Sequence, residues 1–430
     1  MEDGPEMLDI KTIRERTDDV RRAVRDKNVD VDVDRLLSLD SQRRQLLQSS
    51  ESMRAERNQL SKSIPKASNE DRPGIIARVK EIKGQMGQVE EDLKAVETEY
   101  RALMLALPQI PSDDSPVGKD EHDNEVLRHW GKPREFDFEI RDHEELGELL
   151  GILDKKRPVK FAGGRAYVLK GAGALLELAV MRLALDIVME RGFTPILGPL
   201  MVNYEALEGT GFFPHGEEDT YHLERDEKYL IGTSEVHLVA MHMNEILDSE
   251  DLPLLYTGYS PCFRREAGSY GRDTRGVYRV HQFSKVEQVV ICRDDPEESK
   301  KMHHLLLDNS ERVLQALGLP YRVAKACTGD MGQGKVSMFE VETWMPSRQA
   351  YNETHSCSEL YGFQARRLGI RFRDEDGKPR VCYTLNNTAV ASPRILIPIL
   401  ETFQNADGSV DIPEALHKYM NGITRLEPKR

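Results

Sequence analysis

Two stretches near the start of the chain repeat apolar residues with the spacing of a coiled coil. The second stretch places them at alternating steps of four and three, at Ile75, Val79, Ile82, Met86, Val89, Leu93, Val96, Tyr100 and Leu103. The first keeps this spacing with polar interruptions, at Leu36, Leu39, Arg43, Leu46, Ser50, Met53, Arg57, Leu60 and Ile64. Because such a repeat lines up on one side of a helix, we predict two helices that pair along a common seam.

The segment between these stretches, residues 65–74, contains two prolines and ends in a glycine. Proline and glycine interrupt a continuous helix, so the chain is predicted to turn back on itself as an antiparallel hairpin over about 33–106. At a rise of ~1.5 Å per residue, a leg of about 30 residues spans roughly 45 Å. A hairpin of that length is expected to project from the rest of the protein as an arm.

A different pattern begins after a proline-rich, acidic loop at 108–116. A helical stretch at 173–191 and short β-rich runs at 286–292 and 381–385 follow without a strict strand–helix–strand rhythm. We therefore expect an α+β protein. Its first domain, residues 1–110, carries the antiparallel helical coiled-coil arm, and its second, 111–430, has a mixed, mainly antiparallel β-sheet flanked by helices.

Composition limits the possible partners. With 430 residues, 39% of them hydrophobic and 31% charged, the chain has the make-up of a folded protein of two domains, and its apolar runs are shorter than the roughly 20 residues of a membrane span. Its acidic, polar start differs from a signal or transit peptide, so we expect a cytoplasmic protein without a membrane partner. A net charge of -14 argues against indiscriminate coating of DNA or RNA. The scattered cysteines Cys262, Cys292, Cys327, Cys357 and Cys382 are expected to be reduced thiols.

The outer half of the arm, residues 54–83, is locally basic on this acidic chain. It carries four acidic residues and eight basic ones, namely Arg54, Arg57, Lys62, Lys66, Arg72, Arg78, Lys80 and Lys83. One interpretation is a solvated coiled-coil face. The other is a patch that follows the backbone of a structured RNA, which proteins recognise by shape and phosphates. The arm alone leaves both open.

Three segments of the second domain carry candidate chemistry: residues 191–199, residues 262–287 and residues 384–396. The first pairs a helix end with a strand that stops at Pro199, and the third runs from a strand toward a helix with Arg394 near the junction. The second begins Cys262-Phe263-Arg264-Arg265-Glu266-Ala267-Gly268-Ser269 and continues through 272–276, Arg279-Val280-His281-Gln282-Phe283 and Glu287. Together they resemble motifs 1, 2 and 3 of class II aminoacyl-tRNA synthetases, the second in the form of the seryl-tRNA synthetase family.

This resemblance implies catalytic roles for Arg264, Glu266 and Arg394. Attack of a carboxylate on the α-phosphate of ATP brings two anions together, and a guanidinium such as that of Arg264 bridges both better than a lysine. Glu266 would hydrogen-bond the adenine, Phe283 would stack on it, and Arg394 would hold the γ-phosphate. From the residues alone, Phe283 is better explained as a core residue on a β-strand. A lone arginine at a helix start is often an ion-pair partner, but the strand that precedes Arg394 favours the functional role.

Further segments resemble the seryl-tRNA synthetase family and name the amino acid: 232–236, 329–332, 352–358 and 363–367, together with the start at 7–15. The family's serine-binding positions fall on Thr233, Ser234, Glu235, Arg264, Glu287, Asn386 and Thr388. Thr233 to Glu235 would bind the ammonium side, while Glu287 and Thr388 hold the hydroxyl. A pocket built to hydrogen-bond a hydroxyl rejects alanine, because its polar groups would stay unpaired.

The ATP-binding positions implied by the resemblance are Arg264, Arg265, Glu266, Arg279, Val280, Phe283, Glu353, Thr354, His355, Ser356 and Arg394. Glu353 and Ser356 would also hold Mg²⁺ at the ATP phosphates, because hard oxygen ligands suit that ion. His355 and Cys357 are residue types that bind zinc, but no further ligand lies at a suitable spacing, so a zinc site is not expected.

Two departures from the family pattern stand out. Ser234 occupies a position where alanine is more usual, which adds a hydroxyl beside the substrate site. Asn387 and Thr388 occupy positions where glycine and serine are common.

The resemblance thus implies a homodimer, joined near Pro199, that forms seryl-adenylate and charges tRNA-Ser, with tRNA-Sec as a further possible acceptor. The arm of one subunit would present tRNA to the other. One alternative is a paralogue that delivers seryl-adenylate to a carrier protein or a biosynthetic pathway, and the long basic arm argues against it. The other is an inactive scaffold, which the joint presence of Arg264, Glu266, Glu287, Glu353 and Arg394 argues against.

Overall fold

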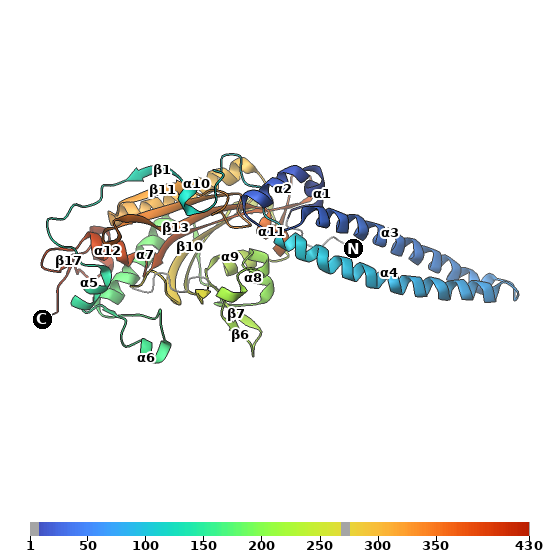
Figure 1. Ribbon diagram of the computed structural model, residues 1–430, viewed down its shortest axis with the longest axis horizontal. Coiled ribbons are helices and arrows are strands. Elements are labelled where there is room, and N and C mark those ends of the chain that lie inside the picture. Colours follow the sequence, from blue (N-terminus) through green and yellow to red (C-terminus); the bar gives the residue numbers. More distant parts are fainter. Residues whose placement is uncertain (1–7, 268–275, 430) are drawn as a thin grey trace. The chain divides into compact units, whose positions relative to one another are not determined.

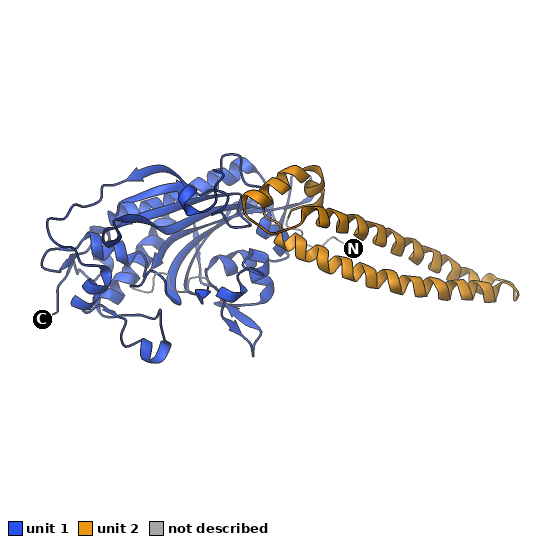
Figure 2. Cartoon of the chain, viewed as in Figure 1, with its two compact units in different colours: residues 1–5, 109–430 blue, residues 6–108 orange. Residues whose placement is uncertain are grey.

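The computed structural model describes residues 8–267 and 276–429, and it divides the chain into two compact units (Figure 2). We call them the arm unit, which ends at Pro108, and the body unit, which begins at Gln109, beside the boundary expected at 110. Within the described ranges, no helix has both the length and the apolar character needed to cross a membrane. Parts of the second motif, Gly268, Ser269 and residues 272–275, lie outside the described residues, as does Met7.

The arm unit is helical, as the repeat predicted. Short helices α1 (Ile10–Glu15) and α2 (Thr17–Asp26) precede α3 (Val33–Ser63) and α4 (Arg72–Ala106), which run antiparallel as a long hairpin (Figure 1). The buried positions of the two long helices include members of both predicted seams: Leu36, Leu39 and Ser50 on α3, and Ile82, Met86 and Tyr100 on α4. The 4-3 spacing therefore brings one side of each helix into the common interface.

The turn of the hairpin is shorter than the sequence suggested. The 3₁₀ turn η1 (Ile64–Lys66) directly follows α3, and α4 already begins at Arg72. Pro73 and Gly74, expected in the turn, therefore lie in the first turn of α4. Proline is tolerated there because the amide hydrogen it lacks would have no partner within the helix.

Ion pairs also cross the hairpin. Arg35 lies 2.6 Å from Glu99, and Arg78 lies 2.9 Å from Glu56. At the base of the arm unit, Arg14 donates two hydrogen bonds of 2.6 and 2.8 Å to Asp40, which is 2% exposed. This pair fastens α1 to α3, because a buried carboxylate is stable only when it is paired and hydrogen-bonded.

An eight-stranded sheet forms the centre of the body unit (Figure 1). Its strands, in spatial order, are β1 (Glu125–Trp130), β11 (Tyr321–Lys325), β12 (Ser337–Met345), β13 (Ala350–Tyr361), β16 (Tyr383–Ser392), β10 (Gln282–Cys292), β9 (Leu254–Phe263) and β4 (Thr194–Ile196). Neighbours pair antiparallel except β4 and β9, which pair parallel. The mixed, mainly antiparallel sheet predicted from the sequence is confirmed.

Smaller elements surround this sheet. The helices are α5 (His143–Leu149), α6 (Val159–Ala162), α7 (Ala172–Glu190), α8 (Tyr204–Thr210), α9 (Glu235–Ala240), α10 (Pro296–Leu317), α11 (Phe363–Leu368) and α12 (Leu396–Thr402). The short strands are β2 (Leu153–Asp154), β3 (Val168–Leu169), β5 (Met201–Val202), β6 (His222–Leu223), β7 (Lys228–Leu230), β8 (Ile246–Leu247), β14 (Arg371–Arg373), β15 (Pro379–Val381), β17 (Val410–Asp411) and β18 (Arg425–Leu426). The 3₁₀ turns are η2 (Glu121–Asp123), η3 (Glu217–Asp219), η4 (Ser249–Asp251), η6 (Pro346–Arg348) and η7 (Glu414–Tyr419).

One predicted β-run is divided between two sheets. Val381 ends β15, which pairs with β14, and Tyr383 begins β16 of the large sheet, so the run expected at 381–385 is interrupted at Cys382. A continuous apolar run does not reveal such a change of sheet, because residues on both sides of it are partly or fully buried.

The large sheet has one apolar face, which joins the core, and one polar face. On one face, Val286, Cys357, Leu385 and Ala389 join a hydrophobic core with residues of α7 and α10. Side chains alternate along a strand, so their neighbours in sequence face the other way. These neighbours are polar, Lys285 and Glu287 on β10, Asn386 and Thr388 on β16, and Ser356 and Ser358 on β13.

Candidate active site

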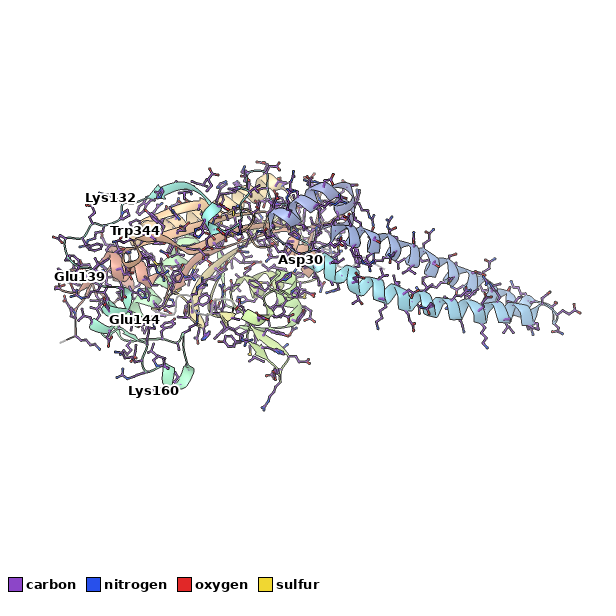
Figure 3. The ribbon with its side chains drawn as sticks, viewed as in Figure 1. Asp30, Lys132, Glu139, Glu144, Lys160 and Trp344 are labelled. Carbon is purple, nitrogen blue, oxygen red and sulfur yellow. The ribbon has the colours of Figure 1, made fainter. Side chains whose placement is uncertain are left out.

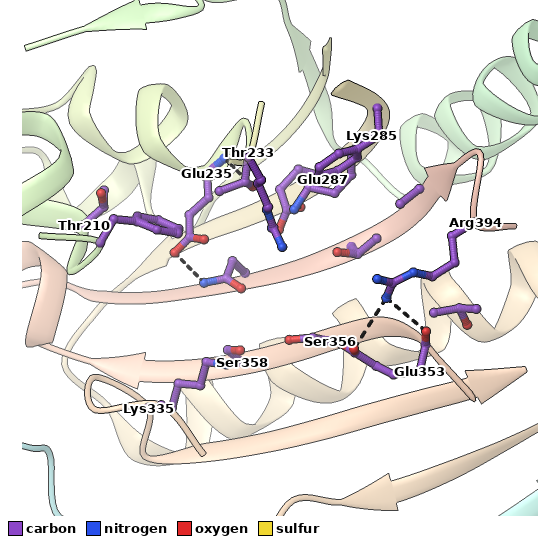
Figure 4. A pocket seen from close by; sticks show the side chains of 18 of the residues that line it. Thr210, Thr233, Glu235, Lys285, Glu287, Lys335, Glu353, Ser356, Ser358 and Arg394 are labelled. Carbon is purple, nitrogen blue, oxygen red and sulfur yellow. Dashed lines mark hydrogen bonds and ion pairs between the residues drawn. The ribbon is translucent and has the colours of Figure 1, made fainter. Parts of the chain in front are cut away.

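A cavity of about 400 Å³ lies over the polar face of the sheet (Figure 4). Strands β10, β13 and β16 contribute its floor, and residues beside α8, α9 and α12 complete the wall. The segment 278–280 and the loop 332–335 also line it. Segments far apart in the sequence therefore meet around one cavity.

At one end of the cavity lie Thr233, Glu235, Glu287, Asn386 and Thr388, all expected to bind serine. The Glu235 carboxylate is 8% exposed and accepts a 2.7 Å hydrogen bond from the Asn386 amide. Burial, and secondarily the charge of Glu287, raises the pKa of Glu235 to about 7. A cationic ligand beside these two carboxylates would stabilise the ionised form of Glu235.

Lys285 also belongs to this end of the cavity, although the motifs did not predict a role for it. Its ammonium forms an ion pair with the Glu287 carboxylate, and both side chains are nearly buried. The two residues are two positions apart on β10, so they point to the same face. This spacing was the available signal, and the ammonium of Lys285 offsets the negative charge of Glu287 inside the cavity.

Ser234 lies beside this end but does not line the cavity. Its hydroxyl is 2.7 Å from the Ser260 hydroxyl and 3.4 Å from the Gly258 carbonyl oxygen, in the buried contact between α9 and β9. The Ser234 hydroxyl, expected beside the substrate, therefore contacts β9 and does not reach the cavity lining. Sequence could not indicate this direction, because the chain is changing from a loop into the short helix α9.

The other departure, Asn387, also turns away from the cavity. Its amide donates hydrogen bonds to the Leu306 carbonyl oxygen at 2.6 Å and to the Ser310 hydroxyl at 2.7 Å, both on α10. The Ser310 hydroxyl in turn donates to the Thr388 carbonyl oxygen at 2.8 Å. Asn387 thereby ties the strand that carries Thr388 to the helix beneath it.

The other wall of the cavity is built from the second motif. Arg264, Glu266, Arg279, Val280 and Phe283 all line it. Nε and Nη2 of Arg264 each lie 3.4 Å from the carbonyl oxygen of Gly232, and the Arg264 guanidinium lies 5.2 Å from the centre of the Phe283 ring. Arg279 and Glu266 form an ion pair of 3.6 Å. Arg265, expected at ATP, is not among the lining residues, and its amide donates to the Asp219 carbonyl oxygen at 2.8 Å.

Arg394 lies between β16 and α12, and in Figure 4 its guanidinium points toward Glu353. Nη1 donates to the Glu353 carbonyl oxygen at 3.1 Å and lies 3.5 Å from its carboxylate. Tyr278 contributes a surface that the sequence did not reveal, because the Arg394 guanidinium lies 4.2 Å from the centre of its ring. Arg348 lies at the same distance from that ring. Two cations therefore meet on one aromatic side chain.

The residues of β13 that were expected to bind ATP or magnesium do not all line the cavity. Glu353, Thr354 and Ser356 line the cavity, whereas His355 does not. The His355 ring is buried, accepts or donates a 2.8 Å bond with the Thr354 hydroxyl, and has its pKa lowered to about 3 by burial. His355 is therefore neutral and turned away from the cavity. On the neighbouring strand, burial and the charges of Glu353 and Asp330 raise the pKa of Glu340 to about 9.

The basic residues of the arm divide into two groups. Arg54 and Arg78 are paired with Glu90 and Glu56, Arg72 donates to the Ile64 carbonyl oxygen, and Arg57 donates to the Asn58 side-chain oxygen. Among the described residues, no ion-pair partner is found for four exposed lysines, Lys62, Lys66, Lys80 and Lys83. These four side chains are open to a ligand of negative charge.

The sheet is mainly antiparallel, and Arg264 lies on one side of its cavity while Arg394 lies at a strand–helix junction on the other. This is the arrangement of a class II aminoacyl-tRNA synthetase. Family models agree, since the "tRNA synthetase class II core domain (G, H, P, S and T)" matches residues 220–403 and the "Seryl-tRNA synthetase N-terminal domain" matches residues 7–111. The chain belongs to the seryl-tRNA synthetase family.

Individual relatives are similar over nearly the whole chain. The serine–tRNA ligase of Deinococcus radiodurans is 51% identical over 416 residues, which cover 97% of this chain and 98% of that protein. A seryl-tRNA synthetase from Pyrococcus horikoshii, solved with ATP, has a TM-score of 0.92 and 39% identity, and covers 99% of this chain and 100% of its own. The cytoplasmic enzyme of Naegleria fowleri, solved with AMP, has a TM-score of 0.87 and 30% identity, covering 99% of each.

Proposed function

We propose that the chain activates serine with ATP and transfers the seryl group to the 3′-terminal adenosine of tRNA-Ser. The observation that carries this proposal is the continuity of one cavity, which joins the Glu235, Glu287 and Thr388 end to the two arginines Arg264 and Arg394. A small polar end suits serine, and the remainder of the cavity, which is lined by arginines, suits a nucleoside triphosphate.

Serine is held at the small end through its two polar groups. The Glu235 carboxylate receives the ammonium, and Asn386 and Thr233 hold that carboxylate and its backbone in place. Glu287 and Thr388 receive the hydroxyl. Alanine is rejected because it would leave these buried groups unpaired, and threonine is rejected by the size of the space.

In the first step, a carboxylate oxygen of serine attacks the α-phosphorus of ATP, and the bond from that phosphorus to the pyrophosphate oxygen breaks. Arg264 contacts both anions and offsets their repulsion, while Phe283 stacks on the adenine and Glu266 hydrogen-bonds it. Arg394 binds the γ-phosphate. The rate arises from positioning and charge, so the step needs no side chain as a general base.

Magnesium fits the donor set beside Arg394. Glu353 and Ser356 supply hard oxygen ligands on the cavity wall, and no group of three His, Cys, Asp or Glu residues within the described ranges forms a metal site of its own. Mg²⁺ usually takes one or two protein ligands and completes its shell with phosphates and water, and it neutralises phosphate charge when bound.

In the second step, a hydroxyl of the terminal ribose attacks the acyl carbon of seryl-adenylate, and AMP leaves. The tRNA would be held by the basic half of the arm, where Lys62, Lys66, Lys80 and Lys83 provide free cations for phosphates. We further propose a twofold dimer joined near Pro199, in which the arm of one subunit presents tRNA to the cavity of the other.

The decisive experiment measures serine-dependent ATP–pyrophosphate exchange and tRNA charging in parallel. We expect charging of tRNA-Ser with serine, and not with threonine or alanine; tRNA-Sec is tested as a second acceptor. Arg264→Ala should nearly abolish exchange while leaving the fold intact. Exchange without any tRNA charging would instead support the paralogue that serves a carrier protein or pathway.

Deleting residues 40–100 separates the arm from the chemistry. We expect exchange to persist and charging to collapse, because the cavity lies entirely in the body unit. Equal loss of both activities would mean that the arm is needed for folding only.

A further inference from the structure

A fully buried carboxylate lies outside the cavity lining and has no role in the steps above. Glu401, on α12, is 0% exposed and accepts four hydrogen bonds from two residues. Its Oε1 accepts from the His143 amide at 3.0 Å, from the His143 ring at 2.8 Å and from the Ser347 hydroxyl at 2.9 Å, and its Oε2 accepts from the Ser347 amide at 3.0 Å. Such a group is costly to bury, so its partners are fixed.

The two hydrogen bonds of the His143 ring determine the role of each ring nitrogen. A backbone amide only donates, so Nε2, which meets the Val277 amide, is an acceptor and Nδ1 is the nitrogen that donates to Glu401. Nε2 lies 3.3 Å from the amide of Val277, which donates to it. Local structure holds the ring in this place, because His143 begins α5 behind the capping box of Asp142 and Glu145.

The neighbouring backbone is fitted closely to this ring. The Gly276 amide donates to Glu144 (labelled in Figure 3) at 2.9 Å. Gly276 has a φ of +69°, and a Cβ at that position would lie 2.2 Å from His143 Nε2. Only glycine fits here, so the start of α5 contacts two successive amides of the second motif.

Both partners of Glu401 are connected to residues that contact Arg394 or share its aromatic neighbour. Val277, bonded to His143, precedes Tyr278, whose carbonyl oxygen accepts from Arg394 Nε at 3.4 Å and whose hydroxyl donates to the Glu353 carbonyl oxygen at 3.3 Å. Ser347 precedes Arg348, which shares the Tyr278 ring with Arg394. Glu401 therefore holds backbone segments on two sides of the part of the cavity that contains Arg394.

We propose that Glu401 and His143 are positioning residues for ATP, which fix Tyr278 and Arg348 around Arg394 without touching the nucleotide. This inference rests on the proposed function, because that function assigns Arg394 to the ATP γ-phosphate. The proposed serine site lies at the other end of the cavity. Loss of either residue is therefore expected to weaken the binding of ATP and to leave the binding of serine unchanged.

The variant His143→Asn tests this positioning role in the full-length chain. Asparagine retains a donor near the position of Nδ1 but has no acceptor at the position of Nε2. We expect the KM for ATP in serine-dependent exchange to rise by about tenfold, the size expected for a lost hydrogen bond to a buried amide. The KM for serine should stay within about twofold of the wild-type value, since the serine end is unchanged.

His143→Gln is the conservative variant, because its amide oxygen lies near the position of Nε2 and can accept from Val277. It should recover most of the ATP affinity that His143→Asn loses. The matched control is His303→Asn, which removes another buried histidine bonded to a backbone oxygen, that of Cys357 at 3.0 Å, on α10 behind the sheet. It should lower the melting temperature and leave both KM values unchanged.

An unchanged KM for ATP in His143→Asn would overturn the proposal, and so would equal increases in the KM values for ATP and serine. If His143→Asn does not fold, the ratio of the two KM values in Glu401→Gln decides in the same way. Absence of exchange in the wild-type chain would contradict the proposed function instead.

Discussion

The side-chain amide of Gln364 donates a 2.6 Å hydrogen bond to Oε1 of Glu235. Gln364 is completely buried on α11, and it also donates to the Thr210 carbonyl oxygen at 3.1 Å and accepts from the Thr384 hydroxyl at 2.8 Å. Asn386 donates to the same Oε1. Two amides therefore orient the carboxylate that we assign to the serine ammonium.

Replacing Gln364 should weaken serine binding selectively. In Gln364→Leu, Glu235 loses one of its two amide donors, and the Thr384 hydroxyl and Thr210 carbonyl lose their partner. We expect the KM for serine to rise about tenfold and the KM for ATP to stay constant, measured by pyrophosphate exchange. Gln315→Leu, which removes a hydrogen bond to Tyr321 remote from the cavity, is the control. A similar rise in the KM for ATP would show general damage to the site.

The pKa of Glu235 predicts a pH dependence of serine binding. Because the folded-state pKa is raised to about 7, this group favours folding fully below the unfolded-state pKa of about 4.5, and that contribution is lost as the pH rises through 7. Serine binding has the opposite requirement, since the ammonium needs the ionised carboxylate. The KM for serine should therefore increase as the pH falls from about 8 to about 6, by up to tenfold per unit below the pKa.

The Glu235→Gln variant is the control for this titration. Its KM for serine should be high and nearly constant over the same pH range. A wild-type KM that does not change with pH would mean that another group receives the ammonium.

Ser234→Ala should leave amino-acid selectivity unchanged. The Ser234 hydroxyl is occupied by Ser260 and the Gly258 carbonyl oxygen, and it does not line the cavity. The ratio of kcat/KM for serine and threonine should stay within about twofold, while the loss of a buried hydrogen bond lowers the free energy of unfolding by about 1 kcal/mol. Exchange kinetics and thermal unfolding measure the two effects. A clear shift toward threonine would place the hydroxyl in the substrate site.

Gly84 and Gly87 lie inside α4 with open space around them. Glycine in a helix interior costs about 0.5–1 kcal/mol relative to alanine, and neither position has a neighbour that excludes a methyl group. Gly84→Ala and Gly87→Ala should each slow amide hydrogen exchange in α4 by roughly two- to fivefold. The exposed Ala77→Gly in the same helix should have the opposite effect. Faster exchange in either alanine variant would contradict this account.

Local patterns in the sequence predicted the elements that depend on neighbouring residues. The 4-3 spacing of residues such as Leu36 and Ile82 predicted the hairpin, because a helix repeats its faces over a few residues. The limits of the turn were less accurate, since Pro73 is compatible both with a turn and with the start of a helix. Alternation along β10 also contained the signal for Lys285 and Glu287 on one face, although it did not indicate that they pair.

By itself, the sequence determined the class of fold, the helical arm and the segments that carry the chemistry, because these follow from periodicity and from contiguous motifs. Only the tertiary structure decided which side chains of those motifs reach the cavity, turning Ser234 and His355 away from it. It also decided the supports of the site, such as Gln364 beneath Glu235 and the bond between His143 and Glu401, which are 258 residues apart. Such contacts depend on strand register and on packing between distant elements, and no local pattern encodes them.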